Sequence, residues 1–429
     1  MDPSKATSPS STACITRSAS SALKTRQNES VWNSHVQSVA HEAYVYAYPM
    51  LEQVKTINGM IHVSGMEFNR AVFNLNLPWD NVGMPIVAPN LTSMTGGILL
   101  DMSHGPVTVE IPEVTDRYIV YQCIDGFTHN FHYMGSRADG GRAGRYVFHR
   151  PGQDVGTDAV PVEVETDHAI IVVRIDISDA TELDRVQDVM DGIRVVDAPA
   201  EVRPYPTYDP ERASGPDFAD YVNDLLSGVP AGESDLFERL APIGLLSDTV
   251  LTDDEKGEVQ AGIDAALSDI EEQGATATAL GNGWVGATTL FGTREYLDAN
   301  YMGRAIGAFF GLWGNSKEEA NYFNCFFEGD SELHFRPDEL PPLSDIGFWS
   351  LTIHDPDMLV RPNEFDSYVI TMDQMEPDED GGMTFRFSSQ PEEGNWLYTP
   401  GPRYAVLLRA YQADPSRIGD YVPPAFTQR

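Results

Sequence analysis

The sequence predicts an α+β protein, mainly β, in which a helical insert separates two antiparallel β-sandwich domains. Three observations predict this fold class. Short apolar stretches punctuated by Gly, Pro and Asp run from Pro85 to about Ile177 and predict strands. Residues 179–312 follow helical spacing instead, and strand-like stretches return from about Tyr322. Several short strands at such intervals are typical of a sandwich.

The chain before the first strands divides into a tail and a helix. Residues 1–30 are rich in Ser, Thr and Ala, carry a net charge of +2 from four basic and two acidic residues, and lack the apolar run of a signal peptide. We therefore expect a disordered tail. From Val31 to about Gly65 the apolar residues recur at helical spacing. Pro49 falls inside this stretch and is expected to kink or end the helix.

The predicted domains follow these changes of pattern. The first helix and the first sandwich occupy residues 31–178, the helical insert 179–312 and the second sandwich 313–429. The clearest strands of the first sandwich read GGILLDM, PVTVEI, RYIVYQCI, NFHYMG, RYVFH and AIIVVRIDI. Those of the second read ELHFRP, GFWSLTIHD, SYVITM, MTFRFSS and RYAVLLRAY.

Acidic residues strongly outnumber basic ones. Asp and Glu total 65 against 28 Lys and Arg, a formal net charge of −37. Because such a field repels phosphate backbones, we expect no nucleic-acid partner. Only five of the basic residues are Lys, and an acidic, Lys-poor composition is typical of proteins from a high-salt cytoplasm, where salt screens self-repulsion. No stretch approaches 18 apolar residues, so we expect no membrane span. A cytoplasmic location is favoured, while secretion and homo-oligomerisation stay open.

The common catalytic motifs are missing from the sequence. It contains no G-x-S-x-G, no P-loop and no H-E-x-x-H. Residues 281–286 have G-x-G-x-x-G spacing, but a helical pattern precedes them and Trp284 would crowd a pyrophosphate, so we expect a loop. His129 and His132 lie three apart on a predicted strand and point to opposite faces, so no metal site is expected. The sequence identifies no cofactor.

Polar and charged residues gather instead in and beside the predicted strands. Such residues are costly in a sandwich unless they are paired. The first set is Asn90, Asp101, Arg117, Tyr118, Asp125, Asn130 and Arg137. The second set is Arg304, Trp349, Ser350, Thr352, Asn395, Trp396 and Arg409. By residue type alone, a buried structural network and a binding pocket both fit.

The same residues carry a resemblance to two families. AYVYAYP (43–49), APNLTSM (88–94) and residues 99–152 resemble the family of unknown function numbered 1254. The C-terminal part resembles its usual partner, the family of unknown function numbered 1214. The residues that match or nearly match the first family's motifs include Asp101, Arg117, Tyr118, Asp125, Thr128, Asn130 and Arg137. Those of the second include Arg304, Trp349, Ser350, Thr352, Asn363, Asn395, Trp396, Arg409 and Tyr411.

This resemblance implies a fold more than an activity. It implies two jelly-roll-like β domains with a helical insert, and a jelly roll often offers a concave face to a ligand. One departure concerns the Pro-Asn-x-Asp-Thr motif of the first family, which reads PNLTS at residues 89–93. Because Thr92 replaces the carboxylate, chemistry that needs this acid is not expected here.

Three functions fit these observations. The first is a hydrolase-type enzyme acting on a small polar molecule or carbohydrate, with Asp125 as the acid/base. In that hypothesis Arg137 takes part in the catalytic site and, together with Asn90, binds an anionic or polar group.

The second function is a non-catalytic module for a small molecule or sugar. Trp349, Trp396 and Tyr118 would then stack on a flat ligand. Asp101, Arg117 and Asn130 complete the set of candidate ligand-binding residues. The third function is a structural or assembly protein, in which the motif residues only hold the fold. The fold class alone does not decide between the three.

Overall fold

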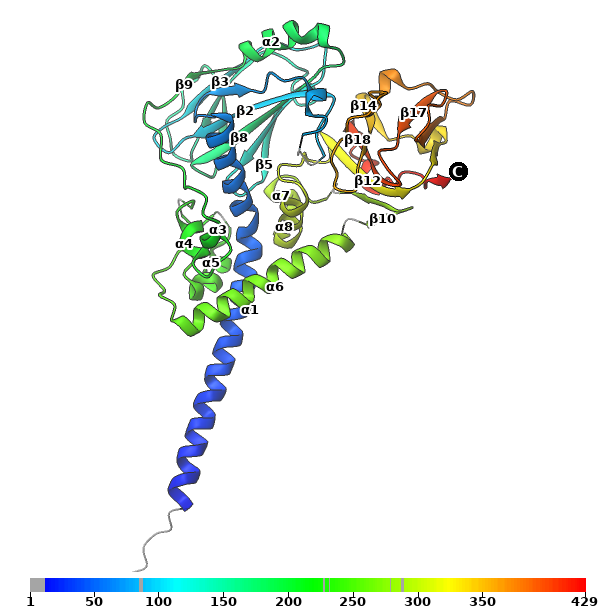
Figure 1. The fold of residues 1–429 in the computed structure, drawn as a ribbon. Helices are drawn as coiled ribbons and strands as arrows, with labels where there is room; N and C mark the ends of the chain where they lie inside the picture. Colours follow the sequence, from blue (N-terminus) through cyan, green and yellow to red (C-terminus); the bar gives the residue numbers. More distant parts are fainter. Residues whose placement is uncertain (1–11, 85–87, 227, 231, 278, 287–288) are drawn as a thin grey trace, which may run out of the picture. The chain divides into compact units, whose positions relative to one another are not determined.

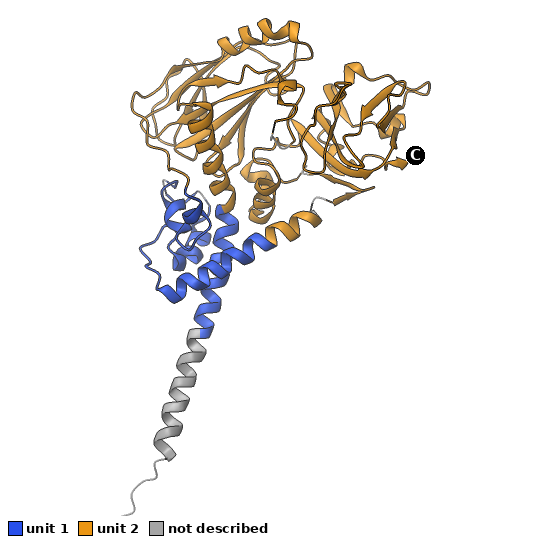
Figure 2. Cartoon of the chain, in the orientation of Figure 1, with its two compact units in different colours: residues 1–47, 209–268 blue, residues 48–208, 269–429 orange. Residues whose placement is uncertain are grey.

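The computed structural model describes residues 12–84, 88–226, 228–230, 232–277, 279–286 and 289–429 (Figure 1). The sheets are mainly antiparallel and are accompanied by helices, so the predicted α+β, mainly β fold class is confirmed. The chain divides into two compact units (Figure 2). One comprises residues 1–47 and 209–268, and the other comprises residues 48–208 and 269–429. Each unit is considered by itself below.

The first unit is helical. It contains the N-terminal part of α1 (Thr12–Ser64), α3 (Pro210–Ala213), α4 (Phe218–Asn223), α5 (Ser234–Leu240) and most of α6 (Asp253–Ala277). Gly262 of α6 allows the close packing of α6 on α1, because a Cβ there would lie 2.5 Å from the carbonyl oxygen of Gln37. Tyr46 of α1 packs edge-on against Phe237 and donates a hydrogen bond of 2.7 Å to Glu233 Oε2.

Helix α1 differs from its prediction at its N-terminal end. It begins at Thr12, so residues 12–30 of the segment predicted as a disordered tail are in this helix, and residues 1–11 lie outside the described part. At the other end, α1 continues through Pro49 and ends at Ser64, close to the predicted end at about Gly65, so Pro49 does not end the helix. Pro49 removes one intrahelical hydrogen bond, which the packing of this buried stretch offsets.

The predicted helical insert is divided between the two units. Helices α3–α5 and most of α6 belong to the first unit, whereas α2 (Leu183–Gly192), α7 (Arg294–Leu297) and α8 (Tyr301–Phe310) belong to the second. Helix α2 buries Val186 and Met190 in the core of the N-terminal sandwich, because these residues lie four apart on one helix face.

The N-terminal sandwich packs two sheets around one apolar core (Figure 1). The five-stranded sheet has the order β1 (Ala71–Phe73), β2 (Ser93–Asp101), β8 (His168–Asp176), β4 (Ile119–Asp125) and β5 (Asn130–Gly135). The four-stranded sheet has the order β7 (Val160–Glu163), β6 (Gly144–His149), β3 (Val107–Ile111) and β9 (Arg194–Asp197). Their facing residues, such as Ile171 and Phe148, are fully buried.

The C-terminal sandwich repeats this plan with a second core. Its six-stranded sheet has the order β10 (Ala279–Gly281), β11 (Trp284–Gly286), β12 (Ala320–Glu328), β18 (Arg403–Ala413), β14 (Leu343–His354) and β15 (Val369–Thr371). Its four-stranded sheet has the order β17 (Asn395–Tyr398), β16 (Met383–Ser388), β13 (Ser331–Phe335) and β19 (Thr427–Gln428). Both sandwiches lie in the second unit.

The two sandwiches meet through the outer faces of their larger sheets. Residues alternate along each strand, so Ile119 and Tyr121 of β4 face the core while Tyr118 and Val120 face outward. The outward residues form a separate apolar cluster with the outer face of the six-stranded sheet, here called the junction. Its residues are Tyr118, Val120, Tyr133, Ala320, Tyr322, Phe348 and Tyr411. The junction therefore joins strands that are far apart in the sequence.

Candidate functional site

Asp125, the predicted acid/base, closes a turn at the end of β4. Its Oδ1 accepts hydrogen bonds from the backbone N–H groups of Phe127 (2.9 Å) and His129 (2.8 Å), and Oδ2 lies 3.4 Å from His129 Nδ1. Burial favours a raised pKa for this carboxyl, but the neighbouring His129 outweighs burial and lowers the pKa. Asp125 lines neither of the cavities described below, so its role in this geometry is to hold the turn.

We expect Asp125→Ala to lower the free energy of unfolding by about 2 kcal/mol. The substitution leaves two backbone N–H groups without an acceptor, whereas Asp125→Asn keeps one acceptor oxygen and should cost less. Urea unfolding of both variants measures the difference. A catalytic role would instead give two equally inactive variants of unchanged stability.

Arg137 is held by an ion pair. Its Nε donates to Oε1 of Glu319, the residue before β12, and its guanidinium lies 5.5 Å from the centre of the Tyr133 ring. Glu319 is 1% exposed, and its Oε2 has no hydrogen-bonding partner in the described part of the chain. Burial raises the pKa of Glu319, and Arg137 opposes this effect. Arg137 therefore neutralises a buried carboxylate, and the structure does not bring it together with Asp125.

The two candidate asparagines tie distant segments together. Asn90 accepts hydrogen bonds from the N–H (2.8 Å) and hydroxyl (2.9 Å) of Thr92 and donates to Tyr411 Oη at 3.2 Å. Thr92 thus fixes the Asn90 side chain. Asn130 donates to Gly314 O at 3.0 Å and accepts from Gln122 at 2.9 Å. Only Asn90 of this pair lines a cavity.

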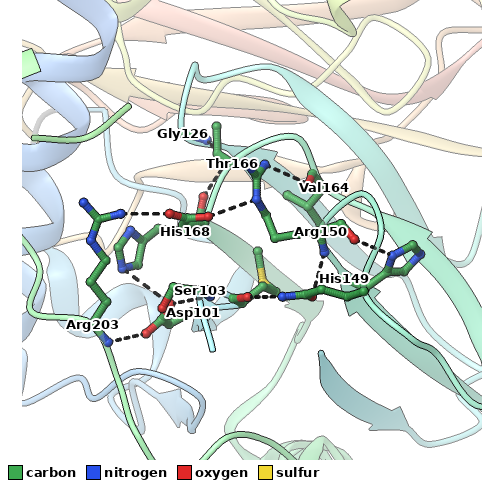
Figure 3. A network of polar contacts seen from close by, with 12 residues as sticks. Asp101, Ser103, Gly126, His149, Arg150, Val164, Thr166, His168 and Arg203 are labelled. Atoms are coloured by element: carbon green, nitrogen blue, oxygen red, sulfur yellow. Dashed lines mark hydrogen bonds and ion pairs between the residues drawn. The ribbon is translucent and has the colours of Figure 1, made fainter. Parts of the chain in front are cut away.

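Asp101 belongs to a polar network at the end of β2 (Figure 3). It is 1% exposed and accepts hydrogen bonds from the N–H groups of Ser103 (2.9 Å) and Arg203 (2.6 Å). The Arg203 side chain in turn binds Asp167, which also pairs with Arg150 at 2.9 Å. These contacts fasten the segment around Arg203 to the sandwich, and Asp101 lines neither cavity.

The two candidate tryptophans differ in exposure. Trp349 is 3% exposed in the C-terminal core, between Phe335 and Phe385 at ring-centre distances of 5.1 and 5.5 Å. The expectation that it stacks on a ligand is therefore corrected, because both neighbours of its ring are core side chains. Trp396 of β17 is half-buried and donates to Ser388 Oγ at 3.0 Å. It lines neither cavity.

The described residues form two cavities where the sandwiches meet, and both take lining residues from each sandwich. The larger one, of about 870 Å³, is named the Asp176 cavity. It is lined by Thr92, Val114, Thr115, Arg117, Tyr118, Ser136, Gly140, Asp176, Ile177, Ser178, Ile346, Gly347, Phe348, Thr371, Met372, Asp373 and Gln412. The smaller one, of about 440 Å³, includes Arg174 and Arg409 and is named the arginine cavity. The candidates Arg117 and Tyr118 line the first cavity, and Asn90 lines the second.

Asp176 is the functional candidate that sequence reasoning missed. It ends β8, and no hydrogen bond of its carboxylate is found in the part of the chain that the structure describes. Burial raises the pKa of Asp176 to about 6; Arg117 opposes this, while Glu182 and Asp373 add to it. The sequence feature that could have indicated Asp176 is the strand AIIVVRIDI. In this strand, Arg174 and Asp176 lie on the face opposite the core. A carboxyl that titrates near neutral pH at a cavity can exchange protons with a ligand.

Other polar groups of the Asp176 cavity are also available to a ligand. The Arg117 side chain is 7% exposed; it donates to the carbonyl oxygen of Asp176 at 3.2 Å and forms ion pairs with Asp116 (3.4 Å) and Glu182 (3.5 Å), so a ligand would share this cation with them. Tyr118 Oη and Gln412 Nε2 are buried and have no hydrogen-bonding partner in the described part of the structure. The lining thus combines two acids, Asp176 and Asp373, with one cation and three buried polar atoms, Arg117 Nε among them, that have no partner in the described structure.

The geometry defines a class: a two-sandwich protein with cavities where its larger sheets meet. Residues 73–197 match the family model described as "Protein of unknown function (DUF1254)" and residues 327–415 match "Protein of unknown function (DUF1214)". The predicted resemblance, N-terminal and C-terminal, is confirmed. Arg117 and Asp176 lie in the first matched region, and Asp373 and Gln412 lie in the second.

A solved structure shows the same fold. The crystal structure of the VPA0106 protein from Vibrio parahaemolyticus has a TM-score of 0.74 and 23% identity, and the match covers 92% of this chain and 100% of that chain. A putative uncharacterized protein from Burkholderia cenocepacia, at 13% identity over 95% of this chain and 97% of that chain, has a TM-score of only 0.45. No curated protein matches the sequence.

Neither a membrane-spanning helix nor a metal-binding cluster is found among the described residues. None of their helices combines the length and the apolar character that crossing a bilayer requires. Within the same residues, His, Cys, Asp and Glu side chains form no group of three that could hold a metal ion.

Proposed function

We propose that this chain is a hydrolase-type enzyme that acts on a small polar molecule in the Asp176 cavity. One observation carries the proposal: a carboxylate without a hydrogen-bonding partner among the described residues lines the larger of the two cavities, and its pKa is about 6. A cavity with a few polar groups and a titrating carboxyl is a common form of active site. Asp176 thereby takes the acid/base role that the sequence assigned to Asp125.

Asp176 can serve as a general base because it is mostly ionised at pH 7 and still basic enough to accept a proton. It takes a proton from a bound water while the water oxygen forms a bond to the electrophilic atom of the substrate. The bond between that atom and the leaving group then breaks, and the same proton passes from Asp176 to the leaving group. Arg117 is the cation of this lining among the described residues, and it can hold a polar or anionic part of the substrate.

We expect Asp176→Asn to lower kcat/KM by about 10²–10⁴-fold. A panel of p-nitrophenyl esters, glycosides and phosphates identifies a hydrolysed substrate, and the wild-type pH profile should then bend near pH 6. Asp188→Asn, an equal charge change at an exposed position of α2, is the matched control and should leave the rate unchanged. Asp373→Asn should move the bend to lower pH, because the negative charge of Asp373 helps to raise the pKa of Asp176. Unchanged turnover in Asp176→Asn contradicts the proposal.

We also expect Asp176→Asn to stabilise the fold above pH 7. The folded pKa is raised from 3.8 to about 6, so folding favours the protonated carboxyl, and its contribution to stability is lost as the pH rises through 6. At pH 7.5 the variant should gain up to about 3 kcal/mol, and the gain should vanish below pH 4. Urea unfolding across this range, with Asp188→Asn as the control, measures it. A gain that does not change with pH would show that the charge of Asp176 is not its cause.

A binding module without turnover is the second candidate. The buried Tyr118 Oη and Gln412 Nε2 favour it, because a ligand could satisfy both atoms without any reaction. Compounds of the panel would then raise the melting temperature while remaining intact, and Asp176→Asn would bind them as well as the wild type.

A further inference from the structure

We propose that the arginine cavity is a separate binding site for a small carboxylate with an apolar body. The proposal does not depend on catalysis at Asp176, because the two cavities have different lining residues. Arg174 of β8 and Arg409 of β18 contribute the cationic part of the lining. Among the described residues, no Asp or Glu lines this cavity. The chain as a whole has a net charge of −37, whereas the charged side chains that line this cavity are both positive.

Arg409 is the strongest indication of an anionic ligand. It is 3% exposed, and its guanidinium donates to Thr352 Oγ1 at 2.8 Å and to the carbonyl oxygens of Ala88 and Pro89 at 3.0 Å. All three acceptors are neutral, and no ion pair of Arg409 is found between described residues. Because a buried cation without a counter-charge is costly, an anion bound beside it would be strongly favoured.

The positive charge of Arg409 also affects the pKa of the nearby His354. His354, which is fully buried two residues from Thr352, has no hydrogen-bonding partner for either ring nitrogen within the described structure. Burial first, and then the positive charge of Arg409, lower the pKa of His354 to about 3, so His354 stays neutral. Asp355 opposes this effect on His354, but it forms an ion pair with Arg361 and none with Arg409 among the described residues.

Arg174 presents a second cation, which also interacts electrostatically with the buried Glu319. It is half-buried and donates to Gln122 Oε1 at 2.8 Å and to the carbonyl oxygen of Trp313 at 3.5 Å, so its acceptors are also neutral. The Oδ1 atom of Asn324, another lining residue, is buried without a partner among the described residues. Two guanidinium groups can together bind a carboxylate through several charge-assisted hydrogen bonds.

The rest of the lining indicates the chemistry of the second part of the ligand. Besides the polar Asn90, Tyr322 and Asn324, it includes an apolar part formed by Leu290, Phe291, Phe310, Leu312, Trp313 and Leu407. A cavity of about 440 Å³ is within the range that holds small organic molecules. The apolar body of a ligand would pack against these side chains and remove them from water. A strongly hydrated ion such as inorganic phosphate would not. The occupant that fits is a compact aliphatic or aromatic carboxylate.

The test compares acids with their uncharged amides on the full chain. Benzoate and hexanoate should bind saturably in calorimetric titrations and raise the melting temperature, and benzamide and hexanamide should not. Arg174→Gln should weaken carboxylate binding about ten- to hundredfold, the loss of one charge-assisted contact. Arg336→Gln, which removes a charge at a side chain 62% exposed, is the matched control and should bind as the wild type does.

A second variant keeps the proposal testable if Arg174→Gln does not fold. Phe310 is 52% exposed, so Phe310→Ala should fold, and it should weaken hexanoate binding more than acetate binding. The proposal is overturned if neither acid binds saturably, if the amides bind equally well, or if both variants bind hexanoate as the wild type does. These experiments measure only binding, so their outcome is independent of the hydrolysis tests at Asp176.

Discussion

Replacing Arg137 by alanine is expected to lower the free energy of unfolding by about 3 kcal/mol. The reason is its partner: Glu319 is 1% exposed and already has one carboxylate oxygen without a hydrogen bond among the described residues. Without Arg137, the carboxylate loses its ion-pair partner and must either stay charged in an apolar setting or take up a proton. Equilibrium unfolding in urea at pH 7.5 measures the loss.

A double-mutant cycle separates this effect from lost packing. In Arg137→Ala/Glu319→Gln the buried charge is absent, so most of the stability should return, and Glu319→Gln alone should cost less than Arg137→Ala. The defect of Arg137→Ala should also shrink as the pH falls towards 5, because protonation removes the unpaired charge. If Arg137 instead acted only on a substrate, Arg137→Ala would reduce activity without changing the urea midpoint.

Trp349→Ala is expected to destabilise the chain by about 3–5 kcal/mol. Trp349 is 3% exposed and packs edge-on against Phe335 and Phe385, so its removal opens a large void in the C-terminal core. Thermal and urea unfolding of the same samples measure the loss.

Trp396 offers a matched control for this substitution. It lies in the same sandwich, is half-buried and contacts Phe365 at 5.3 Å, so Trp396→Ala should cost clearly less than Trp349→Ala. A Trp349→Ala variant that is as stable as Trp396→Ala but fails to bind a ligand would restore the stacking role suggested by the sequence.

The strands were predictable because local patterns determine them. NFHYMG and RYVFH correspond to β5 and β6. Residues 281–286, expected to be a loop, form the turn and second strand of the β10–β11 hairpin. That strand pairs with β12, and such a distant partner leaves no trace in the local sequence.

The site was only partly predictable for the same physical reason. Composition and motifs pointed to Arg117 and Tyr118, which do line a cavity. They could not show that Arg137 is neutralised by Glu319, because the two residues are 182 positions apart. In the local sequence, Asp176 is simply the polar last residue of a strand. Its raised pKa arises from burial and from charges that other segments contribute.

The junction has a consequence for how this architecture can be inherited. Tyr118 lies in the region matched by the first family and Tyr411 in the region matched by the second, and their rings pack 5.5 Å apart. Each sandwich on its own would present these aromatic residues to water and would retain only part of either cavity wall. A recombination event that replaced one half would therefore preserve the fold and the cavities only if it also supplied the matching sheet face.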